Sequence, residues 1–460
     1  MTLHTNIPWS QLEVGMEAEI RRTCRVEDFY VFASSSGNLN PMHLPREDGD
    51  GDGVPEGVAP SMWVGALISG VLGNLLPGPG TLYKSQTLNF LGRAVVDDVL
   101  TAKVRLTAKG ERREATFDTW VERADGSRLA EGQAVVIAPE RTVAVDLRDV
   151  PGLTVRTHAH FDRLLELAEP FDPMPTAVVA PEDAASLGGA LLGQAHTLLR
   201  PILVGHAGRI AAAAAEIGAD PAGFEMIDAA TPMEAATRAV GLVHEGRAGA
   251  VMKGRIHTDD LLRAVLMKQG GLRTERRLSH VFVMDVPGVD HLLMVTDAAI
   301  NIAPDLEQKV DIVQNAIDLA HALGNEMPKA GILAAIETVN PRMPSTIDAA
   351  VLSKMAERGQ ITGGLVDGPL AMDNAIDLEA ARSKGISSAV AGHADILVVP
   401  NLEAGNMLAK ELTFVAHARA GGIVVGAECP IILTSRADDE QSRLASCAVA
   451  VHLREWMRRA

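Results

Sequence analysis

Residues 430–441 read PIILTSRADDEQ, and this stretch indicates how the larger part of the chain folds. Pro430–Thr434 is a short apolar run typical of a buried strand, and it leads directly into a polar turn. A helix is expected to follow, from Gln441 to about Met457. A buried strand that passes through a polar loop into a helix is the building unit of α/β folds.

The same pattern extends back to about residue 150. Buried-strand candidates are Thr176–Val179, Pro201–Val204, Gly249–Met252, Val281–Val286, Leu292–Val295, Gly331–Ile336, Gly363–Val366, Ile396–Val399 and Ile431–Leu433. Helices between them are expected at Ala207–Ile217, Pro232–His244, Leu306–Leu323 and Ser345–Arg358, the last capped by Ser345. Near-continuous apolar strands alternating with helices predict an α/β doubly wound domain, in which ligands bind at the carboxyl ends of strands.

The first 150 residues have a different character. A fully apolar helix is expected at Ser61–Leu76, with Ser61 as its N-cap. Strand-like runs follow at Leu100–Ala108, Glu114–Val121 and Ala130–Ile137. One apolar helix followed by an antiparallel meander predicts an α+β domain whose sheet wraps around the helix. The predicted domains are therefore 1–150 and 151–460, with the boundary at about residues 148–158.

Composition narrows the classes of function. The chain has 460 residues and a formal charge of 42 − 59 = −17, which argues against binding to a phosphate backbone. Its three cysteines give no zinc spacing, and no GxGxxG, GxxxxGK[ST], HExxH or GxSxG motif is present. The apolar run from Met62 to Leu76 is shorter than the roughly 20 residues that span a bilayer. No signal peptide is visible, so a cytoplasmic protein is expected. The cysteine spacing predicts no metal site.

One candidate site lies in residues 32–44, which read FASSSGNLNPMHL. Asn40-Pro41 favours a turn that places His43 at a defined offset. An imidazole there could move a proton to or from water or a substrate. Equally, His43 could bond to backbone in a purely structural role.

This segment, together with SMWVGALISGVLGNLLPGPG and YKSQTLNFLGRAVVDDVLTAKV, resembles the MaoC-like (R)-specific enoyl-CoA hydratases, which have the hot-dog fold. The resemblance covers most of residues 10–140. It implies that His43 stands on the catalytic His of the family, whereas Asn38 stands where the family has its catalytic Asp. Asparagine cannot accept a proton. The resemblance thus implies either weak hydration of an enoyl-CoA or acyl-CoA binding without chemistry.

A second candidate site is the loop after Pro430–Thr434. An Arg at the carboxyl end of a strand beside a helix N-terminus suits a phosphate or acyl-phosphate oxygen, and Arg436 has that position. Ser435 could donate to a developing oxyanion, and a nearby carboxylate could take a proton from a thiol. Alternatively, Asp438 and Asp439 are ordinary helix caps.

Four further segments accompany this loop: AVMKGRIHT at 250–258, TDAAIN at 296–301, VDGPL at 366–370 and PNLEAGNMLAK at 400–410. Together with LTSRADD they resemble the phosphate acetyl/butyryltransferases, especially the butyryl branch with its MKG and SRAD forms. The resemblance covers about residues 160–455. It implies the reaction acyl-CoA + phosphate ⇌ acyl phosphate + CoA, by direct attack and without a metal or other cofactor, with coenzyme A and phosphate as substrates.

The resemblance also implies roles for individual residues. Ser435 and Arg436 fall on the Ser-Arg pair that orients the acyl phosphate, and Asp438 fits the SRAD form as the thiol base. The acetyl branch has its base further on, where this chain has Ser442, so the identity of the base stays open. Substrate-binding roles are implied for Lys253, Arg263 (with a one-residue gap), Asp297, Asp367, Asn406 and Asp439. From the residues alone, the aspartates and Asn406 could instead cap turns, and Lys253 could be a surface residue.

The expectation is thus a two-domain acyl-CoA enzyme, a hot-dog domain fused to a phosphate acyltransferase acting on short acyl chains. Its partners would be acyl-CoA and phosphate or acyl phosphate, without nucleic acid or membrane. Both families imply a homodimer or higher homo-oligomer. Two alternatives stay open: an acyl-CoA sensor without turnover, and a hot-dog thioesterase.

Overall fold

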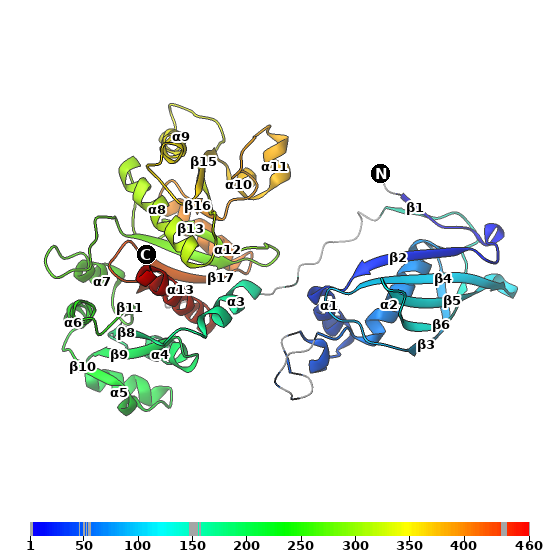
Figure 1. Ribbon diagram of the computed structural model, residues 1–460, viewed down its shortest axis with the longest axis horizontal. Coiled ribbons are helices and arrows are strands. Elements are labelled where there is room, and N and C mark those ends of the chain that lie inside the picture. Colours follow the sequence, from blue (N-terminus) through cyan, green and yellow to red (C-terminus); the bar gives the residue numbers. More distant parts are fainter. Residues whose placement is uncertain are drawn as a thin grey trace. The chain divides into compact units, whose positions relative to one another are not determined.

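The computed structural model describes residues 3–45, 47–48, 51, 53, 57–146, 155, 158–433 and 439–459. The chain divides into two compact units, Met1–Val155 and Arg156–Ala460 (Figure 1). In the described part of the chain, no helix combines the length and the apolar character needed to cross a membrane.

The N-terminal unit is an antiparallel sheet packed on one apolar helix, as the sequence predicts. The sheet has the strand order β2-β4-β5-β6-β3, and α2 lies against it (Figure 1). The buried side chains of α2 belong to the same core as those of the sheet. The strands are β2 (Glu17–Thr23), β3 (Leu82–Phe90), β4 (Val99–Lys109), β5 (Glu114–Arg123) and β6 (Arg128–Ile137), with β1 (Leu3–Thr5) paired to β7 (Ala144–Asp146). The helices are α1 (Val26–Ser36) and α2 (Ser61–Asn74).

The predicted cap of α2 was wrong. Ser61 is already the first helical residue, and Pro60 is the N-cap, without a side-chain cap hydrogen bond. The backbone carbonyl of Pro60 accepts from the amides of Trp63 and Val64. Ser61 therefore does not cap this helix.

The C-terminal unit contains an eleven-stranded mixed sheet with the order β10-β9-β8-β11-β18-β17-β12-β13-β16-β14-β15. Its strands are β8 (Met174–Val179), β9 (Leu199–Gly205), β10 (Glu225–Asp228), β11 (Ala250–Lys253), β12 (Ser279–Asp285), β13 (Leu293–Thr296), β14 (Lys329–Leu333), β15 (Leu365–Leu370), β16 (Ile396–Val398), β17 (Arg419–Val425) and β18 (Ile431–Ile432). All nine predicted buried strands are present.

The centre of this sheet is antiparallel. β10, β9, β8, β11 and β18 form one parallel block, and β13, β16, β14 and β15 form another. Between them, β17 runs antiparallel to both β18 and β12, and β12 runs antiparallel to β13. The two blocks therefore point in opposite directions, and we call β12 and β17 the seam between them.

Helices cover the sheet on both faces, as the doubly wound pattern requires (Figure 1). They are α3 (Ala159–Ala168), α4 (Ala184–Ala195), α5 (Ala207–Glu216), α6 (Pro232–His244), α7 (Thr258–Val265), α8 (Leu306–Ala322), α9 (Pro344–Glu357), α10 (Met372–Ile376), α11 (Leu378–Ser383), α12 (Leu402–Phe414) and α13 (Glu440–Arg459). Ser345 is not the cap of α9, because the helix begins at Pro344 after Met343.

The last helix, α13, is largely buried and is tied to the seam. Its residues 442–453 are buried, and it packs against β17, α3, α4 and α8. Ser446 Oγ accepts from the Gly422 amide at 3.0 Å, which ties the helix to the seam.

Candidate active site

A cavity of about 680 Å³ lies in the C-terminal unit over the seam. Its walls come from the ends of β11 and β18, from β12 and the start of β17, from α12, and from the start of α13. Leu433 and Asp439, the described residues on either side of the 434–438 loop, both line it. The cavity is thus lined by the described residues that flank positions 434–438, where the sequence places Ser435, Arg436 and Asp438.

Three basic side chains line this cavity. Lys253 ends β11, Lys410 is on α12, and Arg419 begins β17. Arg419 Nη1 lies 3.6 Å from Asp162 Oδ1 on α3. Cations gathered from three separate elements give the cavity the charge needed to hold a small anion.

The glycine after Lys253 explains how β11 ends at the cavity. A Cβ added at Gly254 would lie 2.3 Å from the carbonyl oxygen of Val179 and 2.5 Å from that of Ala180. The Gly254 and Arg255 amides instead donate to these two carbonyls at 2.9 and 2.7 Å. The chain therefore turns tightly against the end of β8, and this turn directly follows Lys253.

Asn406 reaches the cavity from α12. A Cβ at the preceding Gly405 would lie 2.8 Å from the Asp297 carbonyl oxygen, so glycine allows α12 to pack closely on the turn after β13. Asn406 Nδ2 donates to the Ala298 carbonyl at 3.3 Å and lies among the residues that line the cavity. The Gly-Asn step has both a structural role and a place in the wall.

Asp439 lies at the start of α13. The Ser442 amide donates to its Oδ1 at 2.7 Å, which is the geometry of a helix cap. Partial burial favours a raised pKa for this carboxyl, but the hydrogen bonds from Ser442 and the charges of Arg419 and Arg443 outweigh burial and lower its pKa. Asp439 is therefore ionised at neutral pH and accepts a backbone hydrogen bond.

The cavity also contains histidines that the sequence motifs did not indicate: His158, His280 and His417. Burial, together with the charge of Arg419, lowers the pKa of His158, whose Nδ1 lies 3.3 Å from the Asp285 carbonyl oxygen. Within the described residues, no cluster of three or more His, Cys, Asp or Glu side chains is arranged to hold a metal ion.

Comparison with known proteins identifies the family. A family model described as "Phosphate acetyl/butaryl transferase" matches residues 223–451. A phosphate acetyltransferase from Rhizobium meliloti is 58% identical over 290 residues, which is 63% of this chain and 92% of the relative. The chain belongs to the phosphate acetyl/butyryl transferase family.

Two further matches define how far this similarity extends. A phosphate butyryltransferase from Clostridium acetobutylicum is 43% identical over 63% of this chain and 96% of its own length. A branched-chain phosphotransacylase from Enterococcus faecalis V583 covers 61% of this chain and 99% of its own, with 31% identity and a TM-score of 0.55. For the N-terminal unit, an (R)-hydratase from Pseudomonas aeruginosa aligns over 34% of this chain and 100% of its own at 33% identity, with a TM-score of 0.32, too low to assign a fold.

The transferase motifs do not all converge on the cavity. Ser435, Arg436 and Asp438 lie outside the described residues, so their roles stay predictions. Lys253, Asn406 and Asp439 line the cavity together. Arg263, Asp297 and Asp367 are described, but they are not among its lining residues.

These three residues have local partners instead. The buried Asp297 carboxylate accepts from the amides of Ala299, Ile300 and Asn301 at 2.9–3.1 Å, so it holds the turn after β13. Asp367, on β15, accepts from Ser353 Oγ and from its neighbouring amide. Arg263 is largely exposed on α7 and pairs with Asp260 at 2.7 Å.

In the N-terminal unit, the two predicted site residues are not hydrogen-bonded to each other. His43 Nδ1 lies 2.9 Å from the Val58 carbonyl, to which it donates. This hydrogen bond leaves the lone pair of a neutral imidazole on Nε2. Asn38 is exposed, and its Oδ1 accepts from the Asn40 amide at 3.2 Å.

Proposed function

We propose that the C-terminal unit transfers a short acyl group between coenzyme A and inorganic phosphate. The supporting observation is the cavity at the seam, which Leu433, Asp439 and three cationic side chains line among the described residues. Similarity to phosphate acetyltransferases and butyryltransferases over about 290 residues supports the same reaction. Written in balance, RCO–SCoA + HPO₄²⁻ gives RCO–OPO₃²⁻ + CoASH.

The chemistry requires an anion site, an oxyanion donor and a proton acceptor. Lys253 and Arg419 hold the phosphate while one of its oxygens attacks the thioester carbonyl carbon. The C–S bond breaks, and the phosphate proton ends on the departing thiolate. Ser435 and Arg436 orient the acyl phosphate.

Of the two candidate bases, Asp438 is the better assignment. Asp439 is committed to the Ser442 amide, and its pKa is lowered, so it is a weak proton acceptor. In the reverse direction, Asp438 takes the proton of the CoA thiol. Asp439 keeps the start of α13 in place beside the cavity.

Release of thiol from acetyl-, butyryl- and crotonyl-CoA, with and without phosphate, tests this function. Phosphate-dependent release is expected, and Arg436→Ala should abolish it without changing the circular dichroism spectrum. Release without phosphate would identify a thioesterase instead. Acyl-CoA binding without any release would identify a sensor.

A second candidate function belongs to the N-terminal unit: an acyl-CoA-binding hot-dog domain with enoyl-CoA hydratase ancestry. The supporting observations are the five-stranded antiparallel sheet packed on α2 and the Nε2 lone pair that its hydrogen bond leaves on His43. Asn38 has no carboxylate that could accept a proton, so hydration is slow. Loss of the enone absorbance of crotonyl-CoA measures it directly.

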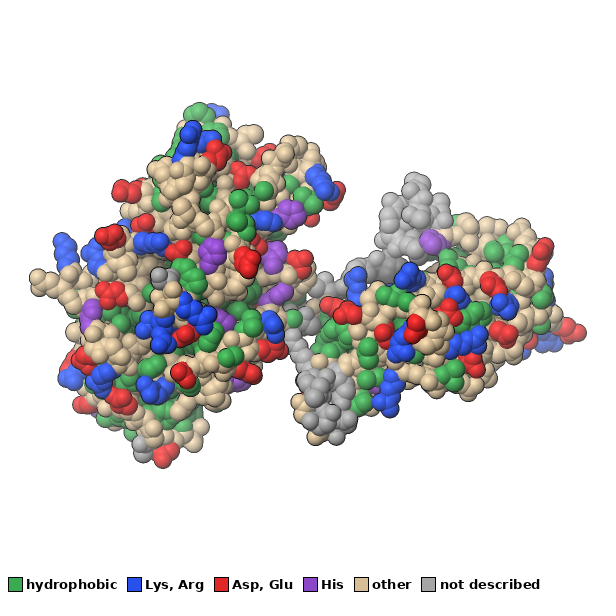
Figure 2. Space-filling model, in the orientation of Figure 1, with side chains coloured by type: hydrophobic (Ala, Val, Ile, Leu, Met, Phe, Trp, Pro, Cys, Tyr) green, Lys and Arg blue, Asp and Glu red, His purple; other side chains and the backbone are tan. Residues whose placement is uncertain are grey.

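The surface of the molecule indicates which kinds of partner it suits. On the face shown in Figure 2, basic and acidic side chains are interspersed, a pattern unlike the basic stripe of a nucleic-acid binder. The edge strand β3 exposes apolar side chains, including Leu82, Tyr83 and Phe90. An apolar edge supports a homo-oligomer, which sedimentation velocity measures.

A further inference from the structure

His280 is a buried polar side chain in the wall of the cavity. It lies on β12, where alternation places it on the same face as Phe282. The two rings meet edge to face, with centroids 4.4 Å apart. Only 1% of His280 is exposed, although both rings line the cavity.

A glycine in the neighbouring strand makes room for this imidazole. A Cβ added at Gly422 on β17 would lie 3.1 Å from His280 Nε2 and 2.9 Å from the Leu433 carbonyl oxygen. The ring therefore lies over the backbone of β17, close to Leu433. Leu433 is the last described residue before position 434, and the predicted catalytic Ser435 and Arg436 follow it in the sequence.

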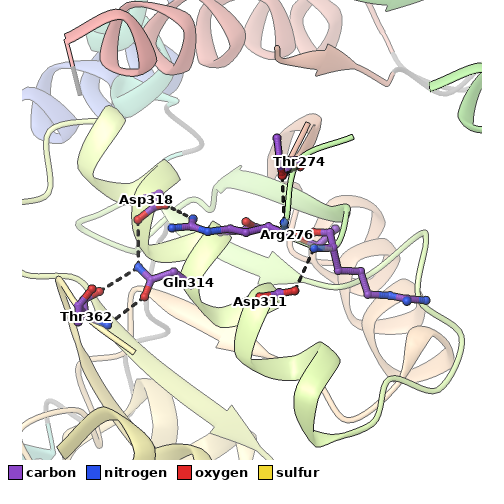
Figure 3. Close-up of polar contacts among 10 residues, drawn as sticks. Thr274, Arg276, Asp311, Gln314, Asp318 and Thr362 are labelled. Atoms are coloured by element: carbon purple, nitrogen blue, oxygen red, sulfur yellow. Dashed lines mark hydrogen bonds and ion pairs between the residues drawn. The ribbon is translucent and has the colours of Figure 1, made fainter. Parts of the chain in front are cut away.

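The backbone that carries His280 is held firmly. Thr296 Oγ1 donates to the His280 carbonyl at 2.9 Å, and Asn315 Nδ2 on α8 donates to Ser279 Oγ at 3.0 Å. The preceding segment is tied to α8 as well: Arg276 pairs with Asp318, and Asp311 accepts from the Arg277 amide at 3.0 Å (Figure 3). The backbone from which the imidazole extends is therefore fixed on both sides of His280.

The nitrogens of this ring have no partner among the described residues. Nδ1 is fully buried and unpaired, and neither nitrogen donates to or accepts from another described group. Buried polar groups are nearly always hydrogen-bonded, so an unpaired one calls for an explanation. Burial lowers the pKa of His280 to about 4, partly opposed by the Asp297 carboxylate, so the ring is neutral at pH 7. A neutral imidazole offers one N–H donor and one lone pair.

We propose that His280 donates a hydrogen bond to the carbonyl oxygen of the acyl group that occupies the cavity. This inference rests on the proposed transferase function. That oxygen is common to the thioester and the acyl phosphate, and it becomes negative when phosphate adds to the carbonyl carbon. The imidazole keeps its proton throughout. A neutral donor beside Phe282 and Leu433 suits the uncharged acyl end of the substrate, whereas the cations suit the phosphate.

Kinetics of ring and amide variants test this role. His280→Phe should lower kcat on the order of 100-fold, with KM changed by less than about threefold, as for the loss of an oxyanion donor. His280→Asn returns a donor near Nδ1, and His280→Gln returns one near Nε2; one of the two should recover about tenfold of the loss. His196→Phe, at an exposed histidine on the end of α4, is the control and should match the wild type. Unchanged kcat in His280→Phe, or recovery by neither amide, would overturn the proposal.

A binding measurement separates this inference from the transferase assignment. The probe is a ketone analogue of butyryl-CoA in which CH₂ replaces the thioester sulfur, with a ¹³C-labelled carbonyl. Its infrared C=O band should shift to lower frequency on the wild type and shift less on His280→Phe, whether or not turnover occurs. An identical bound band in both proteins would refute the hydrogen bond, and absence of phosphate-dependent turnover in the wild type would refute only the transferase.

Discussion

The neutral state of His280 predicts a measurable loss of stability in mild acid. Burial lowers its pKa from the ordinary value of 6.5 to about 4 in the folded chain. Between these two values the unfolded chain binds a proton that the folded chain does not, so stability falls as the pH falls. The contribution is fully present above 6.5, decreases below it, and stops changing below about 4.

The magnitude follows from the window. Inside this window, each pH unit changes the free energy of unfolding by about 1.4 kcal/mol. Lowering the pH from 7 to 5 crosses about 1.5 units of the window, so it removes about 2 kcal/mol of stability through His280. This figure depends little on the exact folded pKa, because pH 5 lies above it. His280→Gln has no titrating ring and should not show this part of the acid sensitivity.

Urea unfolding of the full chain at pH 7 and pH 5 measures the effect. The unfolding free energy of the wild type minus that of His280→Gln should be lower at pH 5 by about 2 kcal/mol. Unfolding of the N-terminal unit is common to both proteins and cancels. His196→Gln, at an exposed position, is the matched control and should follow the wild type. A change below about 0.5 kcal/mol, or one of opposite sign, would show that the ring is not buried as a neutral group.

Three other changes have defined outcomes. Gly422→Ala places a Cβ 2.9 Å from a main-chain carbonyl oxygen and should cost about 1–3 kcal/mol in urea unfolding, together with a lower kcat; wild-type stability and turnover would contradict the packing at the seam. Asp348→Asn removes the carboxylate that lies 2.7 Å from the buried Lys309 ammonium and should lower the free energy of unfolding by about 3 kcal/mol. Adding Lys309→Met should recover part of that loss. An equal loss in the single and the double variant would mean that the charge pair is unimportant. Asn38→Asp should raise crotonyl-CoA hydration by about 10²-fold or more through a new proton acceptor, while Asn40→Asp, which keeps its cap to the Met42 amide, should not.

In the C-terminal unit, the strands that sequence reasoning found are mostly buried, and burial makes their sequences nearly continuously apolar. In the N-terminal unit, β4, β5 and β6 were found from the alternation of apolar and polar residues. β17 was missed, since Arg419-Ala420-Gly421-Gly422 reads as a turn. Its glycines are required by close neighbours, the backbone of α13 and the His280 ring, and neither is visible in the local sequence. The edge strand β10 was missed because two of its four residues are acidic.

The residues of the candidate site could likewise be predicted only in part. One cavity brings together Lys253, Asn406 and Asp439, although the first and the last are 186 positions apart in the sequence. The order of the motifs along the chain was enough to associate these residues. The motifs could not distinguish a ligand contact from a turn cap, which is the local role of Asp297. His280 has no motif, and its significance depends on the register that sets β12 beside β17.

The antiparallel seam also bears on how the C-terminal unit opens. Seven residue pairs join β12 to β17, and this ladder connects two blocks of parallel strands. A sub-global opening that parts the blocks between β12 and β17 breaks that ladder, and a ligand seated on the seam binds only the closed form. Occupancy then raises the free energy of this opening by RT ln(1 + [ligand]/Kd) and slows amide hydrogen exchange along β12 and β17 by the factor 1 + [ligand]/Kd. Bound substrate in this way stabilises the contact between the two blocks of the sheet.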